Sequence, residues 1–383
     1  MRNEYDVVVI GAGSIGVPLS YFLGKKGFKS LVIDSKASPG QGSNKAAIGG
    51  IRATHSSPAK IIIGLKSLDI FRNWEQETGD DIEYYQGGYA FITYQEEDRK
   101  SLKELIKFQQ QFGLKIDFYE KDEILKIIPA LNSEGLLGGT YSPEDGSASP
   151  LLSIESFYKN ARKYGVEFRF NEKVESFNTK DGKIESVKTD RGTYYGKIFV
   201  NAAGGDAARV ADLAGVKIPV MPDSHEGGVT EPVSRFVEPM IVDIKPEKGS
   251  KNFYFYQHKT GQIIFCLTPD PPIWGDDTRE TSSFLPLVAR RMVKVMPKLH
   301  YIRVRRTWRG LYPMTPDGNP IVGYKGYSNF FQLVGMCGQG FMLGPGLGYY
   351  ISEYLEGKKY EEIETILKEF DPDRKFEAEE LLK

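Results

Sequence analysis

The sequence predicts an α/β fold in which a parallel sheet covered by helices forms one domain and an antiparallel sheet forms a second, α+β domain. Two observations lead to this fold class. Short apolar runs end in glycine turns at residues 11, 204 and 335, and such runs are typical of parallel strands that are buried on both faces. Residues 223–270 are instead rich in Tyr, Phe, Val and Ile without a long helical period, which indicates an antiparallel sheet.

The first unit is a strand, a glycine turn, a helix, a second strand and an acid. The strand Val7-Val8-Val9-Ile10 runs into Gly11-Ala12-Gly13-Ser14-Ile15-Gly16. A helix is expected over 17–27 and a second strand over 30–33. Asp34 ends this strand, at about the 20-residue spacing at which a carboxylate binds a ribose hydroxyl.

Each glycine of this turn has a separate physical role. Gly11 permits the tight turn, Gly13 lets a pyrophosphate approach the backbone, and Gly16 lets helix and strand pack closely. The phosphates would lie at the helix N-terminus, where unpaired N–H groups and the helix dipole favour anions. The unit therefore predicts a dinucleotide site, and the acid at Asp34 disfavours the 2′-phosphate of NADP.

The rest of the chain alternates between helix and strand signals. Helices are expected over 61–76, 98–112, 154–164 and 285–295, and strands over 166–170, 174–177, 184–189, 197–204 and 330–334. Residues 335–348 are expected to form a glycine-rich turn before a last helix to about residue 356, and residues 358–383 a solvated charged end. Because parallel strands share their carboxyl edge, the three glycine turns should meet where open α/β sheets bind ligands.

Composition excludes several classes of protein. The 50 Lys and Arg nearly balance 51 Asp and Glu, so the net charge of −1 gives no electrostatic case for a nucleic-acid partner. No apolar run reaches the roughly 18 residues that span a bilayer. Two cysteines cannot form a disulfide framework, which favours a reduced, cytoplasmic protein. Peripheral membrane association through a partner stays open, and the Lys, Glu, Ile and Tyr richness favours a thermophilic source.

Five motifs together resemble the amine-oxidising flavoproteins, the group of D-amino-acid oxidase, glycine oxidase and sarcosine oxidase. The motifs are Gly11-x-Gly13-x-x-Gly16 with Asp34, Gly40-x-Gly42-Ser43, Asn201-Ala202-Ala203-Gly204, Thr315-Pro316-Asp317-Gly318-x-Pro320-Ile321-Val322-Gly323, and Gly335-x-Cys337-Gly338-x-Gly340-Phe341. Residues 308–323 and 340–345 look most like the β subunits of heterotetrameric sarcosine oxidase and of archaeal dye-linked L-proline dehydrogenase.

The resemblance implies a Rossmann-like FAD-binding domain of the glutathione-reductase type. It implies oxidation of an amino acid of the proline, sarcosine or glycine type to its imine, by hydride transfer to flavin N5, with electrons passed to a dye-like acceptor or a partner subunit. The implied FAD-binding domain comprises 1–85, 145–222 and 305–383, and the substrate domain 86–144 and 223–304. An oligomer is expected, and an α-type flavoprotein subunit stays open as partner.

The resemblance also implies which residues contact FAD beyond Gly11, Gly13, Gly16 and Asp34. The reduced flavin ring needs donors near N1, and Gly338 to Gly344, at the start of the last helix, fit that role. The further implied contacts are Ser14, Ile15, Ser35, Gly42, Ser43, Gly49, Gly50, Arg52, Val174, Ala203, Gly204, Gly310, Gly338, Gln339, Gly340, Phe341 and Met342.

Four residues are candidates for the substrate side. Arg52 follows Ser43 by nine residues, as the substrate arginine does in the resembling sequences, and its guanidinium suits a carboxylate; its alternative role is a salt bridge with a buried acid. Tyr312 stands where glycine oxidase carries its carboxylate arginine. His225 would order the amine or accept its proton, with a hydrogen bond inside a sheet as the alternative. Of Tyr254 and Tyr256, which alternate with phenylalanines, Tyr256 is predicted to face the site.

Departures from the resembling sequences refine the prediction. The residue near Gly310 is no cysteine, so FAD should be non-covalent, and Met342 replaces a carboxylate-binding lysine. Isoleucine at 263 and 264 replaces an oxygen-activating lysine, which favours a dehydrogenase. Pro150 replaces the histidine that anchors a second flavin, so an FMN, if present, would be non-covalent at a subunit interface.

No spacing of His, Cys and carboxylate residues suggests a metal site. A hydroxy-acid or glycerol-3-phosphate dehydrogenase and an electron-transfer subunit remain alternatives.

Overall fold

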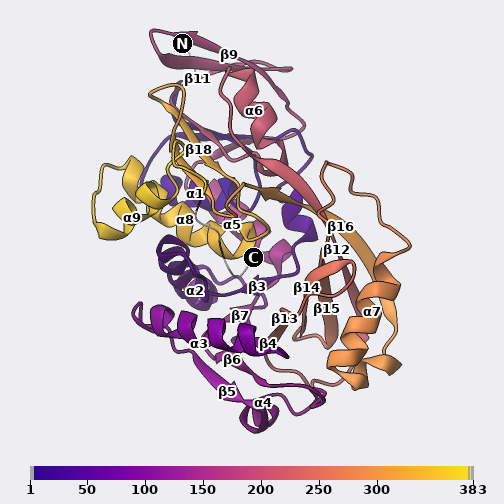
Figure 1. Ribbon diagram of the computed structural model, residues 1–383. Coiled ribbons are helices and arrows are strands. Elements are labelled where there is room, and N and C mark those ends of the chain that lie inside the picture. Colours follow the sequence, from indigo (N-terminus) through magenta and orange to yellow (C-terminus); the bar gives the residue numbers. More distant parts are fainter. Residues whose placement is uncertain (1–3, 378–379, 381–383) are drawn as a thin grey trace.

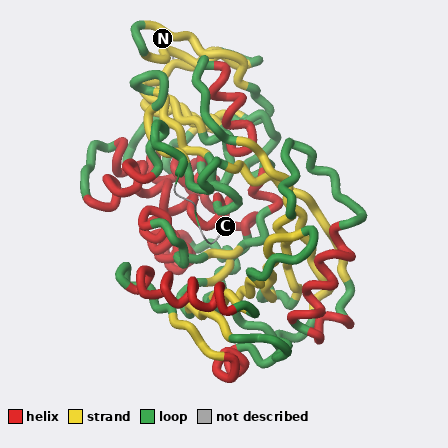
Figure 2. The backbone as a smooth tube through the Cα atoms, in the orientation of Figure 1, coloured by secondary structure: helices red, strands yellow, loops and turns green. Residues whose placement is uncertain are grey.

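The computed structural model describes residues 4–377 and 380 and contains two large sheets that lie side by side (Figures 1 and 2). Six strands of the first sheet follow one path, and a hairpin extends it from β11. In order they are β17 (Ile321–Tyr324), β18 (Phe330–Val334), β11 (Thr193–Asn201), β1 (Glu4–Ile10), β2 (Ser30–Ile33) and β8 (Glu167–Arg169), with the hairpin strands β9 (Val174–Lys180) and β10 (Lys183–Thr189).

The parallel core of this sheet brings the glycine turns together, as predicted. Strand β1 pairs in parallel with both β11 and β2, and β11 pairs in parallel with β18. The turns at residues 11, 204 and 335 follow β1, β11 and β18, so they lie at one edge. At Gly11, φ is +112°, and a Cβ there would stand 2.4 Å from the carbonyl oxygen of Ala202. Only glycine fits this turn without strain.

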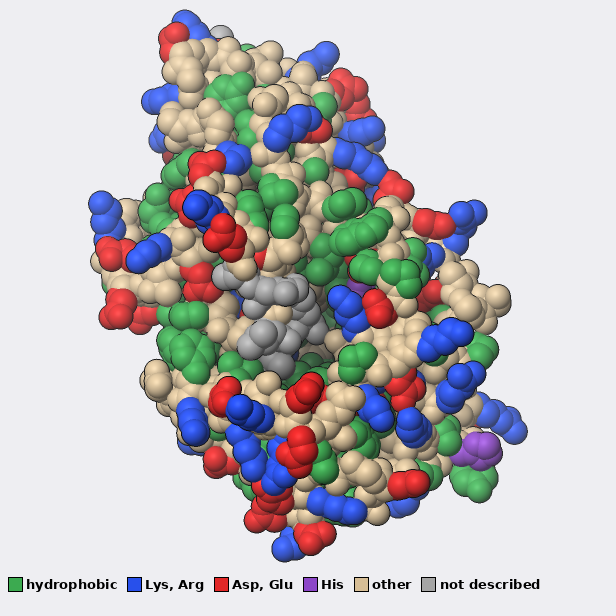
Figure 3. All heavy atoms as spheres, viewed as in Figure 1, with side chains coloured by type: hydrophobic (Ala, Val, Ile, Leu, Met, Phe, Trp, Pro, Cys, Tyr) green, Lys and Arg blue, Asp and Glu red, His purple; other side chains and the backbone are tan. Residues whose placement is uncertain are grey.

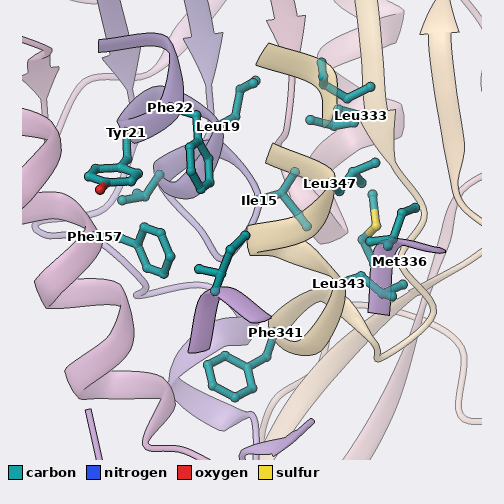
Figure 4. Close-up of a cluster of buried hydrophobic side chains, with 14 of the residues drawn as sticks. Ile15, Leu19, Tyr21, Phe22, Phe157, Leu333, Met336, Phe341, Leu343 and Leu347 are labelled. Carbon is teal, nitrogen blue, oxygen red and sulfur yellow. The ribbon is translucent and has the colours of Figure 1, made fainter. Parts of the chain in front are cut away.

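Helices α1 (Gly16–Lys25), α2 (Pro58–Thr78), α5 (Pro150–Lys163) and α8 (Gly340–Leu355) pack together against this sheet. Figure 4 shows their shared core, where Ile15 and Leu19 of the α1 region, Phe157 of α5 and Phe341 of α8 lie among buried side chains. The helices expected over 17–27, 61–76 and 154–164 are confirmed by α1, α2 and α5, with shifts of up to four residues at their ends.

Helix α8 begins earlier than expected, so the prediction of a glycine turn through residue 348 is wrong. Its glycines serve close packing between helices. A Cβ at Gly344 would lie 1.9 Å from the Ser14 carbonyl oxygen, one at Gly346 would lie 2.2 Å from that of Ile63, and one at Gly348 would lie 2.7 Å from the Leu19 nitrogen. Close backbone approach by neighbouring chains therefore outweighs the low helix propensity of glycine.

The second sheet is mostly antiparallel, as predicted from the composition of residues 223–270, with one parallel pair between β13 (Met240–Asp243) and β4 (Tyr89–Thr93). Its strand order is β16 (Val304–Met314), β12 (Met221–Pro232), β15 (Gln262–Pro269), β14 (Ser250–Gln257), β13 (Met240–Asp243), β4 (Tyr89–Thr93), β6 (Gly138–Ser142) and β5 (Asp117–Glu120). Strand β16 was not expected; it lies in the segment assigned to the FAD-binding domain, yet it pairs along its length with β12.

The two faces of this sheet have different partners. Phe253, Phe255 and Phe265 point into a core with α4 (Lys121–Ile127) and α7 (Phe284–Val295). The opposite face carries Tyr89, Phe91, Met240, Tyr256 and Cys266, which pack against Ile48 of the first domain and Leu102 of α3 (Glu96–Gln110). The predicted alternation of tyrosines and phenylalanines is thus confirmed, and we call this second surface the aromatic face.

The end of the chain is not simply solvated, so that prediction is wrong for its described part. Helix α9 (Glu361–Glu369) buries Ile363 and Ile366, and its Glu369 accepts hydrogen bonds from the Ser57 hydroxyl and, at 2.9 Å, the Ala59 amide at the start of α2. Farther on, Glu380 forms a buried ion pair with Lys60 at 3.3 Å.

The remaining described elements are short. They are the strand pair β3 (Gly50–Ile51) and β7 (Gly146–Ser147), helix α6 (Ala207–Leu213), and three 3₁₀ turns, Ser43–Ala46, Gly204–Asp206 and Pro297–Tyr301. Within residues 4–377, no helix is both long and apolar enough to cross a membrane. On the face drawn in Figure 3, acidic and basic side chains are interspersed, in keeping with the balanced composition.

Candidate functional site

The edge where the glycine turns meet has the geometry of an anion-binding cradle. A Cβ placed on Gly13, Gly42 or Gly204 would meet no other atom within 4 Å, so these backbones face open space. At Gly16 the opposite holds, because a Cβ there would lie 1.9 Å from the Gly11 carbonyl oxygen. The first three glycines leave room for a ligand, whereas Gly16 closes the turn.

Two helices begin at this edge without a side-chain cap. At α1 the N-cap is Ile15 and at α8 it is Gln339, and neither helix has an acidic residue in its first turn. Helices α2 and α5 are instead capped by Ser57 and Ser149. Uncapped N-termini present N–H groups and positive partial charge, which suit the phosphates and ring carbonyls of a dinucleotide.

The other implied FAD contacts on the parallel sheet surround the same edge. Asp34 accepts hydrogen bonds from the Ala12 amide at 2.7 Å and from the Lys36 amide at 2.8 Å, which holds its carboxylate at the glycine turn. Ser35 beside it is exposed, and Val174 begins β9 in the same hydrophobic cluster as Ile33. Ala203 lies two residues after the end of β11. Together the open glycines, the uncapped helices and the Asp34 carboxylate fit FAD.

A second set of implied contacts lies between the two sheets. The Ser43 hydroxyl donates to the Leu311 carbonyl oxygen at 2.7 Å, and a Cβ on Gly310 would stand 2.5 Å from the Cβ of Ala46. A Cβ on Gly338 would stand 2.1 Å from the Tyr312 ring. These contacts join β16 to the 3₁₀ turn Ser43–Ala46 and to the start of α8.

Three implied contacts near α8 differ in how they face this region. Gly340 lies against the Ser14 hydroxyl, with 3.3 Å between that oxygen and a Cβ built on the glycine. Phe341 points into the helix core, with its ring 5.2 Å from that of Phe71, so only its backbone can serve a ligand (Figure 4). Met342 packs against the same core from a partly buried position.

Arg52 lies between the first domain and the aromatic face. It is 4% exposed, its guanidinium donates to the Thr54 carbonyl oxygen, and its Cζ is 5.4 Å from the Phe91 ring and 5.9 Å from the Tyr89 ring. Burial raises the pKa of Tyr89 to about 12, with Arg52 opposing the shift. Gly49 directly precedes β3, and Gly50 is the first residue of this strand, which ends just before Arg52; a Cβ on Gly50 would stand 2.7 Å from Met240. A buried guanidinium beside aromatic rings suits a small carboxylate.

A second group surrounds Tyr312. Its hydroxyl shares a hydrogen bond with that of Tyr254, and the Cys266 sulfur is 3.9 Å away. The His225 ring stacks on Tyr312 with 3.7 Å between centroids and 13° between planes. This stack forms because Gly310, which carries no side chain, is the β16 residue opposite His225. Burial lowers the pKa of His225, while Asp223 opposes this shift; burial raises the pKa of Tyr312 and Tyr254 well above the usual value.

Arg52, Tyr312 and His225 all lie around the aromatic face of the second sheet, but the two tyrosines on β14 have different contacts. Tyr256 donates to the Ile48 carbonyl oxygen at 2.6 Å, whereas Tyr254 contacts Tyr312. Both lie on the aromatic face. Of the other histidines, His55 is fully buried near Arg52, His258 lies 3.2 Å from Glu83, and His300 is exposed.

Sequence reasoning missed three residues near this interface: Tyr89, Asp145 and Asp223. Asp223 precedes His225 by two residues, which in a strand places both on one face, so this signal was present. Asp145 lies in the connection between β6 and β7 and is 1% exposed. It accepts hydrogen bonds from the Ala53 amide at 3.0 Å and the Thr54 hydroxyl at 3.3 Å, and so holds the backbone that follows Arg52.

Replacing Asp145 by asparagine should remove a large part of the pH dependence of stability. Burial raises the pKa of Asp145 to about 7, above the value of about 3.9 for an unfolded chain. The folded state then binds more protons between these values, so the unfolding free energy falls as pH rises from 4 to 7, by roughly 4 kcal/mol in all. The asparagine side chain keeps an oxygen for the Ala53 amide but does not titrate. Urea unfolding from pH 5 to 8 should be flatter in D145N, and an unchanged slope would contradict this account.

Comparison with known proteins agrees with this geometry. The family model DAO, "FAD dependent oxidoreductase", matches residues 6–354. L-proline dehydrogenase of P. horikoshii is 29% identical, and its crystal structure matches with a TM-score of 0.89 over 97% of this chain and 98% of that one. The sarcosine oxidase β subunit of Rhodobacter capsulatus is 23% identical over 92% of this chain and 85% of its own length.

Mitochondrial dimethylglycine dehydrogenase of Rattus norvegicus is 26% identical over 97% of this chain, but the match covers only 45% of that relative. The chain therefore spans less than half the length of this relative. The match to the family model covers both sheets and every element of the candidate site. The chain belongs to the DAO family of FAD-dependent oxidoreductases.

Proposed function

We propose that this protein oxidises a small amino acid, of the proline, sarcosine or glycine type, to its imine. The observation that carries the proposal is Arg52, whose buried guanidinium lies beside Tyr89 and Phe91 of the aromatic face. Bound FAD would accept the two electrons released from the substrate carbon. The relatives that act on proline, sarcosine and dimethylglycine support the same substrate class.

In this proposal, separate side chains around the aromatic face bind the carboxylate, the carbon skeleton and the amine of the substrate. Arg52 binds the substrate carboxylate through two parallel N–H donors. Tyr89, Tyr254 and Tyr312 surround the carbon skeleton, and aromatic walls of this kind suit a ring or an N-methyl group. His225 orders the amine or accepts its proton, because a neutral imidazole can take a proton near neutral pH. Buried side chains on both sides exclude water from the reacting atoms.

We further propose that electrons leave to a dye-like acceptor or a partner subunit rather than to dioxygen. The lysine of the resembling oxidases falls near Ile263 or Ile264; Ile264 packs against the aromatic face, and Ile263 points into the opposite core. A cation that would favour oxygen reduction is therefore replaced by apolar side chains. The relative named as a β subunit supports a partner chain, with a non-covalent FMN at their interface as one arrangement.

A substrate panel tests the proposal. The FAD-loaded protein would be assayed with L-proline, D-proline, sarcosine, glycine, L-lactate and glycerol 3-phosphate, with an artificial dye or air as acceptor. Turnover of one amino acid with the dye, and at least about tenfold slower turnover in air, is the expected result. Turnover of lactate or glycerol 3-phosphate alone would contradict the amino-acid assignment, and fast turnover in air would contradict the assignment of the acceptor.

A further inference from the structure

Asp223 and His225 form a buried pair on strand β12, in which Asp223 has no role in the proposed chemistry so far. Both lie on the same face of β12, and each is 4% exposed. One carboxylate oxygen of Asp223 is 3.0 Å from Nε2 of His225, and the other accepts a hydrogen bond from the Ile273 amide at 2.7 Å. The carboxylate is thus fixed on two sides, by the imidazole and by the backbone of a neighbouring loop.

This contact determines which ring nitrogen of His225 carries the proton. A carboxylate only accepts hydrogen bonds, so Nε2 must be the donor. In the neutral ring Nδ1 is then an acceptor, and within the described residues it has no hydrogen-bond partner. An acceptor nitrogen that is buried without a partner is costly unless a ligand supplies the donor.

We propose that Asp223 is a positioning residue that keeps His225 in the Nε2–H form, so that its unpaired Nδ1 accepts a proton from the substrate ammonium group. This inference rests on the proposed function, in which an amine binds at this interface. In the step, one ammonium N–H bond breaks and an Nδ1–H bond forms; the electron pair of the former bond stays on the substrate nitrogen as its lone pair. The neutral amine can then release electrons from its carbon, and His225 becomes an imidazolium paired with Asp223.

The charges around His225 fit this role. Besides Asp223 on the same strand, the positive charge of Arg309 acts on His225 from the other face of the sheet, where Arg309 of β16 stands opposite Glu226, and the neutral Tyr312 ring stacks on His225. Burial lowers the pKa of His225 and Arg309 lowers it further, while Asp223 raises it. Asp223 therefore keeps the imidazole basic enough to accept a proton although the ring is buried.

Asp223 also holds the loop after β15, so a purely structural role needs its own control. The Asp223→Asn variant keeps an oxygen for the Ile273 amide but turns an NH₂ group toward His225, which would favour the Nδ1–H form. The Thr281→Val variant removes the hydroxyl that donates at 2.6 Å to Glu226, and so loosens the same loop without touching the Asp223 carboxylate.

The first test measures the tautomer directly. Long-range ¹H–¹⁵N spectra of the four histidines, assigned by substitution, report which ring nitrogen is protonated. We expect the Nε2–H form for His225 in the wild type and in T281V, and the Nδ1–H form in D223N. The Nε2–H form in all three proteins would overturn the inference. This readout needs no turnover, so it remains decisive if the proposed substrate is wrong.

The second test measures anaerobic flavin reduction by the substrate found in the panel, between pH 5 and 10. In D223N the maximal rate should fall about 100-fold, in line with loss of general-base catalysis. The acid limb of the pH–rate profile of D223N should move to lower pH, because the carboxylate that raises the pKa of His225 is gone. T281V should keep the wild-type profile. A D223N profile with the wild-type rate and limb would overturn the inference even though the proposed function stands.

Discussion

Replacing Arg52 by alanine is expected to lower kcat/KM for the amino-acid substrate by about 1,000-fold. The guanidinium is buried beside two aromatic rings, where a substrate carboxylate would lose its water and find no other partner of equal charge. Removing one member of a buried charge pair costs about 3–5 kcal/mol, which corresponds to roughly 10²- to 10³·⁵-fold. Dye-linked kinetics with the substrate from the panel measure the effect.

Two further variants show whether the loss comes from the carboxylate contact. Arg52→Lys keeps the charge but not the paired donors, so it should recover part of the activity. Arg305→Ala removes an exposed arginine of strand β16 and should leave KM unchanged. FAD absorbance must be equal in all of these proteins. An R52A enzyme with KM and kcat within threefold of wild type would exclude Arg52 as the carboxylate-binding residue.

Replacing Gly13 by valine is expected to abolish FAD binding while the fold persists. A side chain at this position would meet no protein atom near its Cβ, so it should not disturb the protein, but it would occupy the space above the turn. The dissociation constant for FAD should rise by at least about 100-fold, because the pyrophosphate could no longer approach the backbone. Titration of the apoprotein with FAD, followed by flavin fluorescence, measures this constant.

Gly192→Val is the matched control for this variant. Gly192 also lacks a positive φ, and a Cβ there would have only ordinary contacts, at 3.5 Å and beyond. It lies in the turn between β10 and β11, away from the cradle. Urea unfolding should give both variants a stability within about 1 kcal/mol of wild type. A G13V protein that binds FAD as tightly as G192V does would place the cofactor elsewhere.

The first domain was largely predictable because its signals are local. Continuous apolar runs, glycines at fixed spacing and an acid after the second strand lie within one stretch of about 30 residues, as the dinucleotide fingerprint requires. The glycines of α8 were misleading for the opposite reason. Backbones that are distant in sequence pass so close to Gly344, Gly346 and Gly348 that only glycine fits there. Local helix propensity contains no information about these contacts.

The substrate side was harder to predict because it depends on strand register. The unexpected strand β16 places Tyr312 opposite Asp223 and Gly310 opposite His225, which creates the ring stack. Strand register also explains why the sequence could not distinguish Tyr254 from Tyr256. Alternation places both side chains on one face of the sheet. Only the pairing of β14, β15, β12 and β16 determines which hydroxyl contacts Tyr312. Contacts of this kind become visible only in the folded chain.

An anaerobic titration of the FAD-loaded chain, without any other protein, with the amino acid selected by the panel tests whether this chain alone oxidises an amino acid. About one equivalent should bleach the flavin absorbance completely in the wild type, and R52A with the same FAD content should bleach at least about a hundredfold more slowly at the same substrate concentration. FAD that stays oxidised in the wild type, at saturating concentrations of every amino acid in the panel, would contradict the claim that this chain alone oxidises an amino acid.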